Sequence, residues 1–186
     1  MKLFNVNLLC LLFVGCSSFH KGDVQSSFYL DPIEDKSYYL AVRKYSRIQK
    51  LYSGFETLYF INISYFSEDF LDSFKKRKSR IFSENVELFS YTKNQQVFFI
   101  SLFGPNDDLI DIEDRQEWSI YIKQGDKQIY PESIKKAPKK GVWDTFFPYI
   151  NHWSKEFFIV FNEEINPQDN LVLVIGSTQA KTVIEW

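Results

Sequence analysis

Residues 55–66 read Phe-Glu-Thr-Leu-Tyr-Phe-Ile-Asn-Ile-Ser-Tyr-Phe, and this stretch decides the fold class. Its odd-numbered positions hold only Phe, Thr, Tyr or Ile, whereas its even-numbered positions include Glu56, Asn62 and Ser64. Side chains alternate between the two faces of a strand, so this period of two predicts a β-strand over 55–66. Aromatic and β-branched residues are also strong strand formers.

The rest of the chain carries similar strand signals, most of them after residue 95. We predict further strands at residues 97–103, 118–122, 128–130, 157–161, 171–175 and 182–186. Turn signals such as Gly104-Pro105 and Gly125-Asp126 separate them. About seven short strands with regular turns indicate an immunoglobulin-like antiparallel β-sandwich.

Two helices are predicted to pack on one side of this sandwich. Residues 32–53 follow a capping signal and carry apolar side chains at spacings of three and four, with Gly54 as the stop. Ser67 is a capping residue for a second helix over 68–82. The run 97–103 is apolar on both faces, so one of its faces needs a cover other than the opposite sheet.

The chain of 186 residues has the size of one domain with short appendages. We assign residues 28–186 to a single globular domain, of which residues 95–186 are rich in β-structure. The formal net charge of −2 gives no overall attraction for nucleic acid, so no nucleic-acid partner is expected.

The amino terminus has the pattern of an export signal, because Lys2 precedes an apolar run over residues 8–14 and then Gly15-Cys16. Residues 12–16, Leu-Phe-Val-Gly-Cys, resemble the lipobox of bacterial lipoprotein precursors. The resemblance implies that residues 1–15 are a signal peptide, that Cys16 receives a diacylglycerol, and that residues 16–27 form a tether from an outer membrane. An uncleaved membrane anchor and an ordinary signal peptide are the alternative interpretations.

Catalytic signatures are missing from the sequence. No Gly-x-Ser-x-Gly elbow, phosphate-binding loop or His-Glu-x-x-His pattern is present, and His152 is the one histidine of the predicted domain. We therefore expect no enzyme activity and no cofactor. A hydrolase built on a pair of carboxylates is a further alternative, because sequence does not reveal the separation of such pairs.

Residues 106–114 hold an acidic segment that we interpret as a solvated loop, with no metal site expected. Calcium prefers six to eight oxygen ligands, so five carboxylates make this segment a secondary candidate for that ion. The candidate ligands are Asp107, Asp108, Asp111, Glu113 and Asp114.

Two basic runs, residues 75–80 and 135–140, are candidates for contact with anionic headgroups. The first has an ordinary explanation, because cations are favourable at a helix C-terminus. The second is predicted to be a loop in which solvated lysines are common.

Residues 143–153 hold five aromatic side chains and one histidine. This composition is atypical of a solvated loop, so the rings either close one end of the sandwich or form an exposed patch for a partner. The candidate interface residues are Trp143, Phe146, Phe147, Tyr149, His152 and Trp153.

Residues 117–123 and 153–161 loosely resemble strand patterns of uncharacterised envelope lipoproteins of Gram-negative bacteria. We therefore expect a lipid-anchored, non-catalytic module of the outer membrane or periplasm that binds an envelope protein. A ligand- or calcium-binding lipoprotein is the first alternative, and a hydrolase of envelope polymers is the second.

Overall fold

The computed structural model describes residues 35–82, 92, 94–138, 141–163, 165 and 170–186. The predicted signal peptide (1–15), the lipidation site Cys16 and the tether (16–27) lie outside these residues. So does the predicted start of the first helix at residues 32–34.

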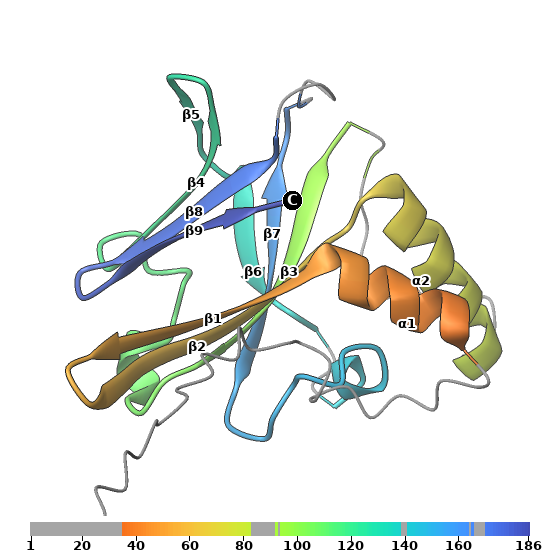
Figure 1. The fold of residues 1–186 in the computed structure, drawn as a ribbon, viewed down its shortest axis with the longest axis horizontal. Helices are drawn as coiled ribbons and strands as arrows, with labels where there is room; N and C mark the ends of the chain where they lie inside the picture. Colours follow the sequence, from red (N-terminus) through yellow and green to blue (C-terminus); the bar gives the residue numbers. More distant parts are fainter. Residues whose placement is uncertain (1–34, 83–91, 93, 139–140, 164, 166–169) are drawn as a thin grey trace, which may run out of the picture.

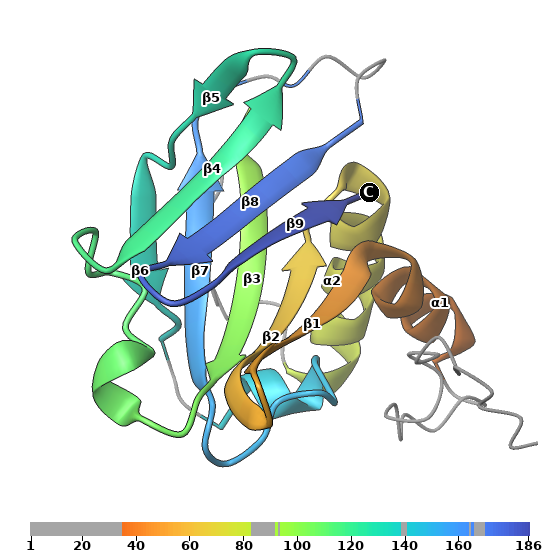
Figure 2. The same ribbon diagram turned by 60° about the vertical axis from the view of Figure 1, so that its left-hand side comes forward.

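The described residues form two antiparallel sheets (Figures 1 and 2). The strand order is β1-β2-β3-β7-β6 in the five-stranded sheet and β5-β4-β8-β9 in the four-stranded sheet. The strands are β1 (Ser46–Ser53), β2 (Glu56–Tyr65), β3 (Gln96–Phe103), β4 (Trp118–Gln124), β5 (Lys127–Ile129), β6 (Ser133–Lys136), β7 (Lys155–Phe161), β8 (Val172–Ser177) and β9 (Lys181–Glu185).

One hydrophobic core lies between the two sheets. The alternation in β2 directs Tyr59, Ile61 and Ile63 into it. Side chains such as Ile120 from β4 and Leu173 from β8 meet them from the other sheet. A mainly β, sandwich-like architecture is therefore confirmed, and the strand period in residues 55–66 identified the buried face of β2 correctly.

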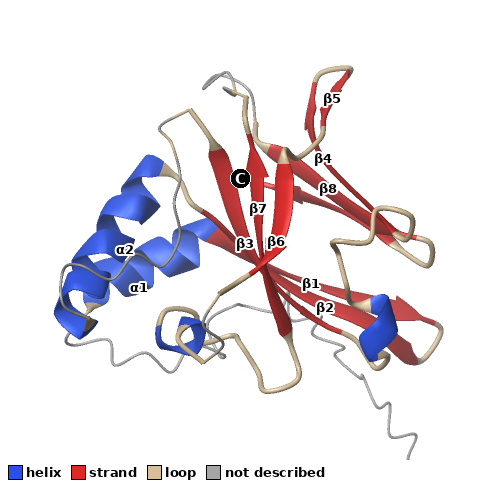
Figure 3. Ribbon diagram, turned by 180° about the vertical axis from the view of Figure 1, so that it is seen from behind, coloured by secondary structure: helices blue, strands red, loops and turns tan. Residues whose placement is uncertain are grey.

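A second core lies on the outer face of the five-stranded sheet, where the helices pack. The helices are α1 (Lys36–Tyr45) and α2 (Glu68–Ile81). Their buried side chains include Tyr38, Phe70 and Phe74, which belong to one hydrophobic cluster with the outward-facing Phe99 and Phe158 of β3 and β7. Figure 3 shows both helices on the same side of the molecule. This arrangement explains why β3 is apolar on both faces and confirms the predicted helical cover.

The predicted helix over 32–53 is wrong in its second half. The helix ends at Tyr45, and residues 46–53 form strand β1, which pairs with β2. The prediction extended the helix because Ile48 and Tyr52 are four residues apart. That spacing places two side chains on one face of either a helix or a strand, so it does not distinguish the two structures. Gly54 adopts a φ of +59° in the two-residue hairpin loop rather than ending a helix.

The strand count is also corrected. The described residues contain nine strands instead of about seven, because β1 and β6 were not predicted. Strand β6 includes Lys135 and Lys136, which we had assigned to a loop. The helix predicted over 68–82 is confirmed as α2, and the Ser67 hydroxyl accepts the Phe70 N–H at 3.2 Å as an N-cap.

Candidate interaction site

The aromatic segment 143–153 divides into a buried and an exposed part. Four of its rings belong to the second core, between the five-stranded sheet and the helices, rather than to an end of the sandwich. The Phe147 ring stacks on Phe99 of β3 with centroids 4.3 Å apart, and the Phe146 ring lies 4.6 Å from Phe74 of α2. The interface candidates Trp143, Phe146, Phe147 and Tyr149 are therefore buried in the structure.

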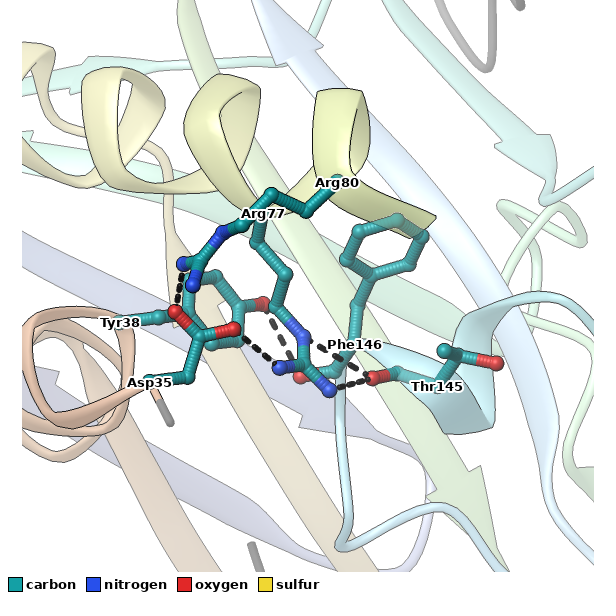
Figure 4. A network of polar contacts seen from close by, with 6 residues as sticks. All are labelled: Asp35, Tyr38, Arg77, Arg80, Thr145 and Phe146. Atoms are coloured by element: carbon teal, nitrogen blue, oxygen red, sulfur yellow. Dashed lines mark hydrogen bonds and ion pairs between the residues drawn. The ribbon is translucent and has the colours of Figure 1, made fainter. Parts of the chain in front are cut away.

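Polar contacts from both helices hold the backbone of this segment in place (Figure 4). The Tyr38 hydroxyl donates to the Phe146 carbonyl oxygen at 2.9 Å. The Arg77 guanidinium donates to the Thr145 carbonyl oxygen and also binds the Asp35 carboxylate at 2.6 Å. Arg80 contacts the other oxygen of Asp35. These contacts join α1, α2 and the segment into one unit.

Tyr149 anchors the far end of the buried part. Its hydroxyl lies 2.8 Å from the Ser64 hydroxyl of β2, which in turn bonds to Ser46 of β1. Burial raises the pKa of Tyr149 far above its usual range, although the Ser64 hydrogen bond opposes that effect. The phenol is therefore neutral at physiological pH and acts as a structural hydrogen-bonding group.

His152 and Trp153 form the exposed end of the segment. The Asn151 side-chain oxygen accepts the Trp153 N–H at 2.8 Å, and the Asn151 carbonyl accepts the Ser154 hydroxyl at 2.8 Å. This tight turn directs both rings outward, with centroids 5.1 Å apart in an edge-to-face arrangement. Trp153 is 71% exposed, so its ring is presented to solvent on a hydrogen-bonded turn.

A pocket of about 220 Å³ lies beside this turn. It is lined by Gly141, Trp143, Asp144, Ile150, Asn151, His152 and Glu156. Two carboxylates and an imidazole therefore share a concave surface with an indole. Such a lining suits a side chain that combines an apolar stem with a positive or hydroxylated end.

The acidic segment forms ion pairs with a neighbouring strand. The Lys136 ammonium of β6 lies 3.0 Å from Asp111 and 3.8 Å from Glu113, whereas Asp107 and Asp108 are exposed in a short 3-10 turn. Asp114 accepts the Gln116 N–H. Within the described residues, no three His, Cys, Asp or Glu side chains gather closely enough to hold a metal ion.

The structure places the two basic runs on different elements. Lys75, Lys76, Arg77, Lys78 and Arg80 occupy the last half of α2, whereas Lys135 and Lys136 belong to the edge strand β6. Lys139 and Lys140 lie outside the described residues. Neither described helix is long and apolar enough to cross a membrane.

A trough on the outer face of the four-stranded sheet was not predicted from sequence. Two adjoining hollows of about 530 and 420 Å³ share Tyr121, Gln128, Val174 and Lys181. The Tyr121 and Tyr130 rings lie 5.8 Å apart, and the Lys181 ammonium lies 3.2 Å from the Tyr121 hydroxyl. The alternation of polar and apolar residues in β4 could have indicated this face, but not its hollow shape.

The sequence matches no protein-family profile, and no curated protein matches it.

Proposed function

We propose that this protein is a lipid-anchored, non-catalytic interaction module of the bacterial cell envelope. The anchor rests on the resemblance of residues 12–16 to a lipobox, with Cys16 as the acylated residue. Two or three acyl chains would hold the mature protein on an outer membrane, at its periplasmic or outer surface. We also propose that the two sheets form an immunoglobulin-like sandwich.

The exposure of Trp153 carries the interaction part of this proposal. Tryptophan is enriched among the residues that dominate the energy of protein interfaces. Its ring lies on a hydrogen-bonded turn beside the pocket that contains Asp144 and Glu156. We infer a protein partner that covers the Trp153 ring and inserts a lysine or arginine side chain into this pocket.

Crosslinking in intact cells tests the interaction. The wild-type protein and Trp153→Ala are crosslinked, purified in detergent and analysed by mass spectrometry. Phe55→Ala is the matched control, because Phe55 is an exposed ring at the tip of the β1–β2 hairpin. We expect one recurrent partner with the wild type and with Phe55→Ala, and its loss with Trp153→Ala. A partner retained by Trp153→Ala would overturn the assignment of this site.

The same preparation tests the anchor. We expect the amino-terminal peptide to begin at Cys16 and to carry the mass of a diacylglycerol and a further acyl chain. Cys16→Ser should leave the precursor unprocessed and unacylated. An unmodified Cys16 in the wild type would contradict the lipoprotein assignment.

The trough around Tyr121 favours a second candidate function, the binding of a small ligand such as a glycan. Neighbouring tyrosine rings with nearby amide and ammonium groups are suited to sugar rings and hydroxyls. Tyr121→Ala should abolish retention on envelope glycans in this case, and Trp153→Ala should not affect it. Retention that is unchanged by Tyr121→Ala would remove this candidate.

A further inference from the structure

The two helices run antiparallel, so the start of α1 lies beside the end of α2. Asp35, the residue before α1, binds Arg77 and Arg80 near the end of α2 (Figure 4). At the opposite end, the Tyr45 hydroxyl of α1 donates to Asp69 at the start of α2, at 2.8 Å. We call the end that contains Asp35 the basic end of the helix pair.

The two ends of the helix pair differ in net charge. The basic end carries Lys36 from α1 together with the cations of α2, which are Lys75, Lys76, Arg77, Lys78 and Arg80. At the other end, the acidic side chains Glu68, Asp69 and Asp72 face Arg43 and Lys44 of α1, and Lys44 pairs with Asp69 at 3.5 Å. Lys36, Lys75 and Lys76 are exposed, and the Arg80 side chain is 52% exposed although it contacts Asp35. The basic end is therefore a solvent-facing cluster of positive charge.

Helix electrostatics alone explain only part of this cluster. Cations in the last turns of α2 are stabilised by the helix dipole, but Lys36 occupies the first position of α1, where the dipole disfavours a positive charge. Leu40 follows Lys36 on the same side of α1 and is 51% exposed, and Ile81 at the end of α2 is also exposed. The apolar faces of both helices pack on the sheet, so Leu40 and Ile81 are the apolar side chains that this end offers to a membrane surface, beside its lysines.

We propose that the basic end of the helix pair docks on the anionic lipid surface to which Cys16 anchors the chain. This inference rests on the proposed lipidation. Lys36 comes twenty residues after Cys16, so the backbone between them spans at most about 70 Å. The chain from Cys16 enters the described domain at the basic end, because Lys36 begins α1, whereas the β1–β2 hairpin lies on the far side of the domain (Figures 1 and 3).

Because the protein is anchored covalently, a modest electrostatic attraction is sufficient to dock the basic end on the bilayer. Because the acyl chains already hold the protein on the bilayer, the docking step is intramolecular and occurs at a high effective concentration. The attraction arises within a Debye length of the headgroups and must therefore weaken at high salt. Docking would orient the domain with the β1–β2 hairpin directed away from the membrane.

Energy transfer between the domain and the bilayer tests this orientation. The full lipidated protein is reconstituted into vesicles that contain a headgroup-labelled acceptor lipid. A donor dye is attached at Ser79→Cys on the basic end or, as the matched position, at Ser53→Cys at the hairpin tip. The vesicles are phosphatidylcholine alone or phosphatidylcholine mixed with phosphatidylglycerol.

We expect phosphatidylglycerol to increase transfer from position 79 but not from position 53. The increase should disappear in about 1 M salt, at which the Debye length is about 3 Å. The double variant Lys36→Glu/Lys76→Glu should also abolish it. The control Lys50→Glu/Lys123→Glu reverses two exposed lysines on strands β1 and β4 and should retain it. Melting curves of both double variants verify that they fold.

Equal transfer in the two kinds of vesicle, or an equal increase at both dye positions, would overturn the proposal. An increase that survives Lys36→Glu/Lys76→Glu would do the same. Failure of the lipid anchor gives a different result, because the protein would then not float with either vesicle in a density gradient. Failure of docking and failure of the anchor are therefore distinguishable.

Discussion

The Tyr38 hydroxyl and the Phe146 carbonyl oxygen, 108 residues apart in the chain, form a buried hydrogen bond of 2.9 Å. It ties α1 to the segment that carries the candidate interaction site. Burial is the largest effect that raises the pKa of Tyr38 well above its usual range. The hydroxyl therefore remains protonated and able to donate.

Tyr38→Phe leaves the Phe146 carbonyl without this donor in a dry environment. We expect a loss of about 1–3 kcal/mol in the free energy of unfolding, the cost of an unsatisfied buried polar group. Urea denaturation measures it. Tyr52→Phe is the control, since that tyrosine is exposed on β1 and its hydroxyl should contribute little. Equal stability of the two variants would show that the Tyr38 bond is unimportant.

Phe147→Ala and Trp153→Ala separate the buried and exposed parts of the aromatic segment. Phe147 is fully buried against Phe99, so its truncation should cost about 3–5 kcal/mol. Trp153→Ala should leave the melting temperature nearly unchanged while it weakens partner capture. A drop of several degrees for Trp153→Ala would indicate a structural role for that ring instead.

Arg77 and Arg80 share the buried Asp35 carboxylate but should contribute unequally. Arg77 is largely buried and also satisfies the Thr145 carbonyl, so Arg77→Met should cost about 3 kcal/mol, as for a broken buried ion pair. The Arg80 side chain is half exposed, and Arg80→Met should cost about 1 kcal/mol or less. The order of the two melting temperatures tests this ranking, and the reverse order would contradict it.

The ion pair between Asp111 and Lys136 predicts a pH dependence. Partial burial favours the protonated carboxyl, but hydrogen bonds from Lys136 and from the Glu113 N–H outweigh it and lower the pKa of Asp111. A lowered folded-state pKa gives stability that is present above the ordinary carboxyl pKa of about 4 and is lost as the pH falls through the folded value.

Asp111→Asn should therefore destabilise the protein at neutral pH by at most about 1 kcal/mol, since the pair is partly exposed. The difference from the wild type should shrink in acid, as the pH falls through the lowered pKa of Asp111. Urea denaturation at neutral and at acidic pH measures it. A difference that persists in acid would point to packing rather than charge.

Ser101 and Ser64 should respond oppositely to alanine substitution. The Ser101 hydroxyl of β3 is buried and finds no hydrogen-bond partner in the described part of the chain. Its removal should be neutral or stabilising by about 1 kcal/mol. Ser64→Ala breaks the bonds to Ser46 and Tyr149 and should cost about 1–3 kcal/mol. Comparable losses in both variants would refute this contrast.

Local sequence patterns were sufficient to predict the strands and the helix whose periodicity is unambiguous. The odd-numbered positions of β2 carry strand-forming Thr, Tyr and Ile, and α2 begins at a capping serine and shows one apolar face. These signals are local, because side-chain period and end capping depend on residues within a few positions of one another. Because residues 97–103 are apolar on both faces, the sequence also predicted that helices cover one face of β3.

The tertiary structure alone decided where α1 ends, that β6 is a strand, and which aromatic rings are exposed. Ser46 leaves the helix because β1 gains its hydrogen bonds from β2, and Lys135 and Lys136 are extended because β7 pairs with them. Phe147 and Trp153 lie in the same aromatic segment, yet one faces β3 and the other solvent. Strand β6 and the buried rings depend on partners distant in sequence, and β1 depends on pairing with the adjacent strand β2, so the side-chain period of these segments alone does not determine their structure.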